Sequence, residues 1–311
     1  MVRGIRLRAG EPALLLSAAA YGVSTTVSVV ALRAVRPADL LAVEISGAAT
    51  MLLVTAAARG QLRRRGAMRQ MLTGALVPGL AFLFGDLGLA RTSASSGSLL
   101  LAAEPLLSVL LAVAVLGERL SGRAVLALVV GLTGGALVAV EPGGGPAGTD
   151  TTAGTVLVLL AVVAAAVFLI ATRRFNDGGD GLNESAWQST GGLLSVVPFV
   201  ILSWSTGGTR LGTVGAEGWL ACIAVVVCGA VGGVLFNRGI GRVPAARAGL
   251  LGNLTPVAGT LTAVVFLGDR PSSLQMIGGA AILAGLVLLL RSPAGPPSPN
   301  THQSELVEDY R

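Results

Sequence analysis

Residues 88–137 and 239–288 are two copies of one segment, and this repeat constrains the fold of the 311-residue chain more than any other feature. With an offset of 151 positions, sixteen of fifty columns are identical, whereas a chain this rich in Ala, Leu, Gly and Val should give roughly six by chance. Pro105 aligns with Pro256, and each proline starts an apolar run that ends in Leu-Gly-acid-Arg. A period of half the chain indicates two related halves rather than a solenoid.

The composition places the chain in a membrane. Apolar residues make up 53% of it and charged residues 12%, with a mean hydropathy of +0.77, whereas soluble domains carry about 25% charged residues. All 22 basic residues are arginines, and no basic stripe with interleaved aromatics points to nucleic acid. The single histidine, His302, lies in a polar tail, so no metal or other cofactor is expected.

Ten apolar runs are long enough to cross a bilayer, which takes roughly 20 residues per helix. They are continuous and lack the ten-residue alternation of barrel strands, so an all-α integral membrane protein with ten transmembrane helices is predicted. The predicted spans are 13–32, 38–58, 70–90, 96–116, 122–140, 154–172, 183–204, 217–237, 246–267 and 273–291.

The runs divide into two five-helix repeats, residues 1–140 and 154–291, joined by a Gly/Pro-rich linker at 141–153 and followed by a disordered polar tail at 292–311. Five is an odd number, so the second repeat must be inverted in the membrane. If the N-terminus is inside, seventeen arginines fall on the inner side and five on the outer side. The positive-inside rule therefore predicts cytoplasmic termini for a multi-pass protein of the cell (inner or plasma) membrane.

The two copies resemble a known family. A proline-started helix that ends in Leu-Gly-acid-Arg and precedes a Gly-rich helix, present twice, is similar to the EamA-type repeat of the drug/metabolite transporter superfamily. Residues 90–97 (Ala-Arg-Thr-Ser-Ala-Ser-Ser-Gly) also resemble the stretch before the family's fourth helix, and residues 241–248 match it more loosely. The resemblance covers about residues 13–291.

The resemblance implies two inverted five-helix repeats around a central cavity, lined largely by helices 1, 3, 4, 6, 8 and 9. It also implies a permease, often an exporter, for amino acids, metabolites, drugs or nucleotide sugars. Members often carry a basic residue in helix 2 where this chain has Glu44.

Two acids inside the predicted spans are the main candidates for proton or substrate binding, because ionisable groups are costly in a bilayer. Glu104 lies about 12 Å along helix 4, directly before Pro105. Pro105 and Pro256 are expected to open their helices by freeing a backbone carbonyl. Glu44 lies about 9 Å into helix 2 and is the second choice. The alternatives are a structural hydrogen bond for Glu104 and an arginine partner for Glu44.

Further candidates for substrate or proton binding accompany these acids. Gln188 aligns opposite Glu44 in helix 7, and Asp86 in helix 3 aligns with Asn237 in helix 8. Asp86 has the alternative of an interfacial acid that reaches water. The remaining candidates are Tyr21, Trp187 and Asn253, and core packing is the alternative for both aromatic residues.

A secondary transporter explains these features best. No Ser/His/Asp set, HExxH or CxxC occurs, and the glycine-rich linker lacks the Lys-Ser/Thr of a nucleotide loop. A non-transporting structural or sensory membrane protein remains the alternative. Only Arg247 could offer a cation to the cavity, so a neutral, zwitterionic or cationic solute fits better than a phosphorylated one. The expected partners are this solute and the lipid bilayer, with protons and a second copy of the chain left open.

Overall fold

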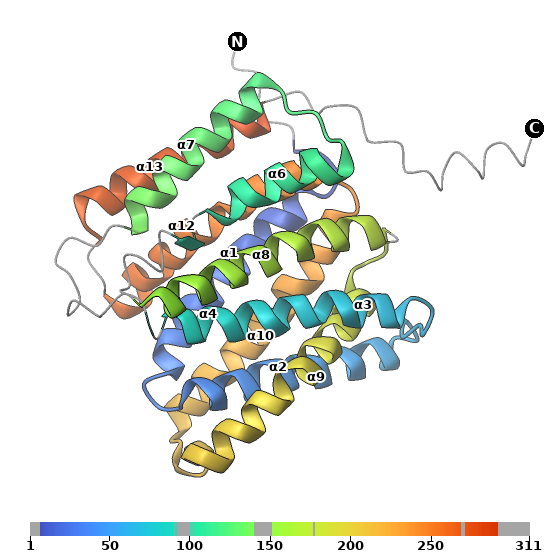
Figure 1. Ribbon diagram of the computed structural model, residues 1–311, viewed down its shortest axis with the longest axis vertical. Coiled ribbons are helices and arrows are strands. Elements are labelled where there is room, and N and C mark those ends of the chain that lie inside the picture. The colour runs from blue at the N-terminus through green and yellow to red at the C-terminus, as the bar shows by residue number, and fades with distance from the viewer. Residues whose placement is uncertain are drawn as a thin grey trace, which may run out of the picture.

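The computed structural model describes residues 7–89, 91, 100–101, 103–139, 151–176, 178–268 and 271–291, and the regular elements in these ranges are all helices (Figure 1). They are α1 (Glu11–Ala31), α2 (Pro37–Ala58), α3 (Ala67–Gly74), η1 (Ala75–Leu80), α4 (Ala81–Leu89), α6 (Glu104–Leu116), α7 (Gly122–Ala139), α8 (Thr152–Phe175), α9 (Leu182–Gly207), η2 (Leu211–Thr213), α10 (Ala216–Ile240), α11 (Ala245–Gly252), α12 (Leu254–Thr262), η3 (Ala263–Leu267) and α13 (Ser273–Leu290).

The helices suit a bilayer in length and in surface. Eight helical segments of the described chain are long and apolar enough to cross a membrane, and Glu104–Leu116 and Gly122–Leu137 are shorter apolar helices. Large apolar side chains such as Leu202, Leu220 and Phe266 are exposed on the outside. Lipid can cover such faces, and a helix satisfies its own backbone groups there. The predicted all-α membrane class is therefore confirmed.

Three of the predicted spans are interrupted among the residues described. In the span 96–116, residues 100 and 101 are helical, Ala103 lies in a turn and α6 starts at Glu104. The predicted span 70–90 comprises α3, η1 and α4, and the backbone at Val77 leaves the helical region (φ −139°, ψ 121°) one residue before Pro78. Proline disfavours helical angles in the residue before it. The predicted span 246–267 comprises α11, α12 and η3, with a turn at Asn253 three residues before Pro256.

The main contacts join the first half of the chain to the second. α1 packs along α10 and α12, while α8 packs along α4 and α6. α2 packs on α9 and α6 on α11. α7 and α13 lie side by side as a pair at one edge of the molecule (Figure 1). Each half therefore buries its apolar surface mainly against the other half.

The two copies of the repeated motif end their helices in the same way. Gly117 follows α6 with φ 65° and ψ 22°, and Gly268 follows η3 with φ 69° and ψ 19°. Both are left-handed, a conformation that glycine adopts without a steric penalty. The shared glycine of Leu-Gly-acid-Arg is thus a helix stop in both halves.

Glycines bring α3 and α9 into direct backbone contact. A Cβ on Gly74 would overlap the carbonyl oxygen of Gln188, and a Cβ on Gly191 would overlap that of Met71. Small residues at a helix crossing allow such an approach. The crossing also sets Gln188 beside the side chains of Gln70 and Thr73.

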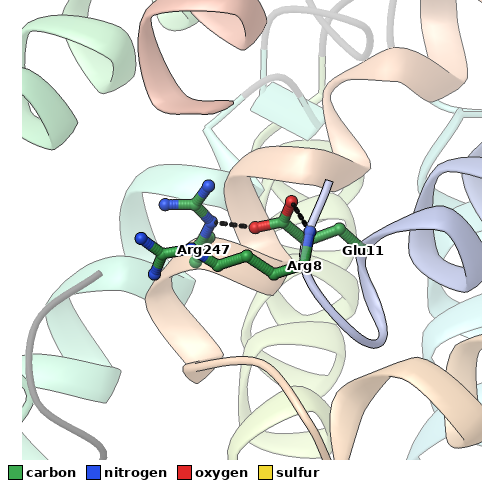
Figure 2. Close-up of polar contacts among 3 residues, drawn as sticks. All are labelled: Arg8, Glu11 and Arg247. Atoms are coloured by element: carbon green, nitrogen blue, oxygen red, sulfur yellow. Dashed lines mark hydrogen bonds and ion pairs between the residues drawn. The ribbon is translucent and has the colours of Figure 1, made fainter. Parts of the chain in front are cut away.

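A buried ion pair joins the start of α1 to α11 (Figure 2). Arg247 Nε lies 2.6 Å from Glu11 Oε1, and the Arg8 backbone N–H donates to Glu11 Oε2 over 3.0 Å. The exposed fraction is 0% for Glu11 and 6% for Arg247. Arg247 is therefore part of the helix packing at this end of the molecule.

Candidate functional site

A cavity lies between the two halves of the chain, and both halves contribute to its wall. The space between its atoms is about 550 Å³, including the part open to solvent. α1, α2, η1 and α4 line it from the first half, and α8, α9 and α10 from the second. Four of the residues singled out in the sequence line this one cavity: Tyr21, Glu44, Gln188 and Asn237.

Two amides form the polar part of the wall. Asn237 Nδ2 donates to Gln188 Oε1 over 2.7 Å and to Ser185 Oγ over 2.9 Å. Gln188 Nε2 donates to Gln70 Oε1 over 3.0 Å. Gln188 and Asn237 are 4% and 1% exposed. Buried polar groups are stable when paired in this way, so the cluster fixes α9 and α10 against α3.

Glu44 brings a carboxylate to the same cavity from α2. A Cβ built on Gly229 would lie 3.4 Å from Glu44 Oε1, so the carboxylate lies beside the bare backbone of α10. In the part of the chain that the structure describes, no hydrogen bond or ion pair reaches this carboxylate. The arginine partner considered from the sequence is therefore absent among the described residues.

Aromatic rings cover the apolar part of the wall. Phe168 of α8 and Phe236 of α10 stack with ring centroids 5.6 Å apart and an interplanar angle of 22°. Phe82 of α4 and Tyr21 of α1 add two further rings. The Tyr21 ring fits against α10 because Gly232 has no side chain; a Cβ there would lie 3.2 Å from the ring. Such rings suit the apolar part of a ligand.

The interruption of the third span borders the cavity as well. Val77 and Pro78 of η1 both line it, and the backbone at Val77 is extended rather than helical. Irregular backbone at membrane depth occurs where it is buried in protein or lines a cavity, and transporters bind substrates at such breaks.

The other acids singled out in the sequence lie outside this lining. Glu104 is half-buried at the first turn of α6, where the helix starts again just before Pro105. Asp86 has an exposed side chain on α4, close enough to Glu44 to interact with it electrostatically. The structure thus places Glu44, and neither Glu104 nor Asp86, on the cavity wall.

Two further candidates lie elsewhere. The half-buried Trp187 donates from Nε1 to the carbonyl oxygen of Arg63 over 2.9 Å, so it ties α9 to the connection between α2 and α3. Asn253 lines a separate small cavity of about 180 Å³, where its amide lies against Gly131 of α7. The structure does not bring these side chains to the cavity that holds Glu44.

Several residues of the cavity were not singled out in the sequence. Phe82, Phe168 and Phe236 are surrounded by apolar residues, and nothing in their spacing separates a cavity wall from ordinary packing. Pro78 did carry a signal, because a proline inside a predicted span marks a break. Ser185 lies one helical turn before Ser189 on α9, and both line the cavity.

One family model matches the chain twice, over residues 8–140 and over residues 152–291. The chain belongs to the EamA-like transporter family. The resemblance inferred from the duplicated motif is thereby confirmed.

Named relatives and a solved structure agree with this membership. The chain is 30% identical over 215 residues, 67% of its own length and 68% of the relative's, to a protein of Streptantibioticus cattleyicolor named as a probable terminal-alkyne amino-acid exporter. It is 25% identical to the uncharacterized transporter YyaM of Bacillus subtilis over 84% of its own length and 86% of the relative's. The alignment with a solved crystal structure covers 91% of this chain and 96% of the chain in that structure. Its TM-score is 0.74 and the identity is 22%, which establishes likeness of fold.

The EamA-like chain is therefore a multi-pass membrane transporter. The function predicted from the sequence is confirmed at this level. Its family and named relatives are transporters, which agrees with the lack of a catalytic constellation in the sequence.

Proposed function

We propose that the protein exports a small organic solute by alternating access and that the cavity between the two halves is the transport site. The observation that carries this proposal is the shared wall, because α2 and η1 of the first half face α9 and α10 of the second across one cavity. A site held between two bodies can open to either side when one body rocks against the other. Export is the activity in the name of the Streptantibioticus cattleyicolor relative.

The proposed architecture is ten transmembrane helices in two inverted repeats, residues 1–140 and 154–291. Three observations support it. The family model matches the chain twice. The contact of α1 with α10 has its counterpart in that of α8 with α4. Gly117 and Gly268, 151 positions apart, stop their helices with nearly equal backbone angles.

We propose that both termini are cytoplasmic in the cell membrane, because the positive-inside rule assigns seventeen of the 22 arginines to that side. Reporter fusions after Arg311 and within residues 143–149 test this orientation. An inverted second repeat puts the two points on opposite sides of the membrane. Reporters that respond on the same side would exclude five spans in the second half.

The solute class follows in part from the wall. Of the described residues that line the cavity, Glu44 is the one charged residue, and it is an acid. The aromatic rings favour a solute with an apolar part. We therefore propose a neutral, zwitterionic or cationic metabolite, with amino acids that carry apolar side chains first on the panel because of the relative named as an amino-acid exporter.

Counterflow in proteoliposomes tests the function. Purified protein is reconstituted, loaded with one unlabelled solute of the panel at a time, and assayed for uptake of the same labelled solute. We expect counterflow for at least one apolar amino acid or related metabolite. Gln188→Leu should abolish it by breaking the amide cluster, whereas Gly279→Ala should keep it because no atom lies within 4 Å of the added Cβ. Folded protein without counterflow for any solute would favour the structural or sensory alternative.

A further inference from the structure

We propose that Glu44 is the counter-charge for a protonated amine on the transported solute, so that the cavity selects organic cations, or zwitterions by their ammonium group. This inference rests on the proposed function and deepens it, because it names the chemical group that the cavity recognises. It concerns a position at which this chain departs from the basic residue that the family resemblance suggests for helix 2.

The first argument is the state of the Glu44 carboxylate. It lies on the cavity wall against Gly229, and in the described part of the chain it has no hydrogen-bond or ion-pair partner. An ionised acid inside a membrane protein is costly unless a partner offsets the lost hydration. Glu11, a buried acid at the start of α1, has its partner in Arg247 at 2.6 Å. Glu44 therefore lacks the kind of partner that Glu11 has, and a cationic ligand would supply it.

The charge around the cavity points the same way. The described residues that line it include no arginine. Asp86 lies within electrostatic reach of Glu44 and adds a second negative charge near this wall. Acids without a lining base offer a partner to a cation and none to an anion. A carboxylate or phosphate ligand would have to approach these acids without compensation.

The amide cluster does not compete for the role of counter-charge. Gln188 and Asn237 donate and accept within their own group, with distances of 2.7 to 3.3 Å between their side chains. Their donors are largely used by protein acceptors, so the cluster offers polarity without charge. Glu44 is thus the group that can bind an ammonium by a charge-assisted hydrogen bond.

The rings provide the rest of the complementarity. Tyr21 lies near Glu44, since the two interact electrostatically, and its ring faces the cavity with Phe168, Phe236 and Phe82. An ammonium group near an aromatic face gains cation–π attraction, and an apolar tail gains contact with the stacked pair. A compact amine with an apolar tail therefore matches the wall better than a polar cation.

Binding of matched ligands to the purified full chain tests the inference directly. The probes are phenethylamine, its neutral analogue 2-phenylethanol, and L-phenylalanine as the zwitterion, with affinity measured by isothermal titration calorimetry in detergent. We expect phenethylamine to bind at least tenfold more tightly than 2-phenylethanol. An affinity for L-phenylalanine between those for the other two probes indicates a plain amine site. A higher affinity than that for phenethylamine indicates an amino-acid site.

Three variants separate a specific charge effect from damage to the fold. Glu44→Gln should reduce the preference for the amine to less than threefold, and Glu44→Asp should restore most of it. Glu217→Gln should leave it unchanged, because Glu217 is exposed in the first turn of α10 and outside the cavity lining. Melting curves of each variant establish that it is folded.

The inference would be overturned by equal affinities for the amine and the alcohol, or by no binding of phenethylamine. A preference that survives Glu44→Gln would overturn it too, because it would show that Glu44 is not the counter-charge. These outcomes are distinct from failure of the proposed function. Counterflow of a solute without an amine would contradict the inference and leave transport intact. Amine selectivity in a protein that shows no counterflow would support the inference and contradict the proposed transport function.

Discussion

Glu118 Oε1 accepts a hydrogen bond from the backbone N–H of Ala245 over 2.7 Å, and its second oxygen accepts one from Ala246 over 2.9 Å. Glu118 is the acid of the first Leu-Gly-acid-Arg motif, and Ala245 is the first residue of α11. The motif acid of one half therefore caps a broken helix of the other half. This contact gives the acid of the first copy a structural role.

Removing this cap should destabilise the fold. Glu118→Ala should cost about 0.5–2 kcal/mol, the range measured for helix N-caps, with Glu118→Gln between it and wild type because the amide oxygen can still accept. Urea unfolding in detergent measures the change. Glu217→Gln is the control, since that acid is exposed in the first turn of α10.

The proposed inverted repeat extends this prediction to Asp269, which aligns with Glu118 and lies outside the described residues. Asp269→Ala is expected to destabilise the protein by an amount similar to Glu118→Ala. No effect at Asp269, with a clear effect at Glu118, would argue against the symmetry.

The ion pair between Glu11 and Arg247 should behave as a unit. Arg247→Met leaves the buried Glu11 carboxylate without its cation, and breaking a buried pair in this way costs about 3–5 kcal/mol. The double variant Glu11→Gln with Arg247→Met should be less destabilised than Arg247→Met alone. A double-mutant cycle of unfolding free energies measures the coupling. Additive effects would show that the two charges do not depend on each other.

The glycine crossing of α3 and α9 should tolerate no side chain. Gly191→Ala forces the two backbones apart, because the new Cβ overlaps the carbonyl oxygen of Met71. Overpacking of this kind costs about 1–3 kcal/mol, occasionally more, and should also displace the neighbouring Gln188 cluster. Folded yield and melting temperature are the measurements. Gly279→Ala in α13 should change neither, and equal loss in both variants would count against the crossing.

Glu104 remains the sequence-based candidate for proton coupling, because its place outside the cavity lining does not decide that role. If it couples protons, Glu104→Gln should lose pH-driven accumulation of solute in proteoliposomes and keep downhill counterflow, because the amide keeps the shape without the titration. Measuring both transport modes at several pH gradients separates the two effects. Unchanged concentrative uptake with an unchanged pH dependence would leave Glu104 as a structural hydrogen-bonding group.

The sequence predicted the helical membrane class, and it singled out four residues that line the cavity. Both results have a physical reason. Glu44, Gln188 and Asn237 are polar in segments that are otherwise apolar, and such residues face the inside of a helix bundle. Tyr21 lies in the interior of the first span. The structure adds that these four residues share one wall.

The rest depended on three-dimensional relationships that a linear pattern does not contain. Depth along a helix suggested Glu104, but the side that a residue faces is set by packing, and Glu104 is not among the residues that line the cavity. The rings of Phe168 and Phe236 meet only because α8 and α10 converge. Likewise, Trp187 finds its acceptor in a loop more than a hundred positions earlier in the chain.

Cysteine accessibility from the two sides of the membrane tests the central claim most directly. Cys222 and Cys228 are first replaced by alanine, and Ser189, which lines the cavity and is 8% exposed, becomes the single cysteine. Leu202→Cys, on an exposed apolar face of α9, is the control that a charged membrane-impermeant maleimide should not reach. Membranes of the two opposite orientations are prepared separately, so that the reagent reaches one side of the protein in each. If the cavity is the alternating-access site, the reagent should label Ser189→Cys in both preparations. Labelling from one side alone, or from neither, would contradict it.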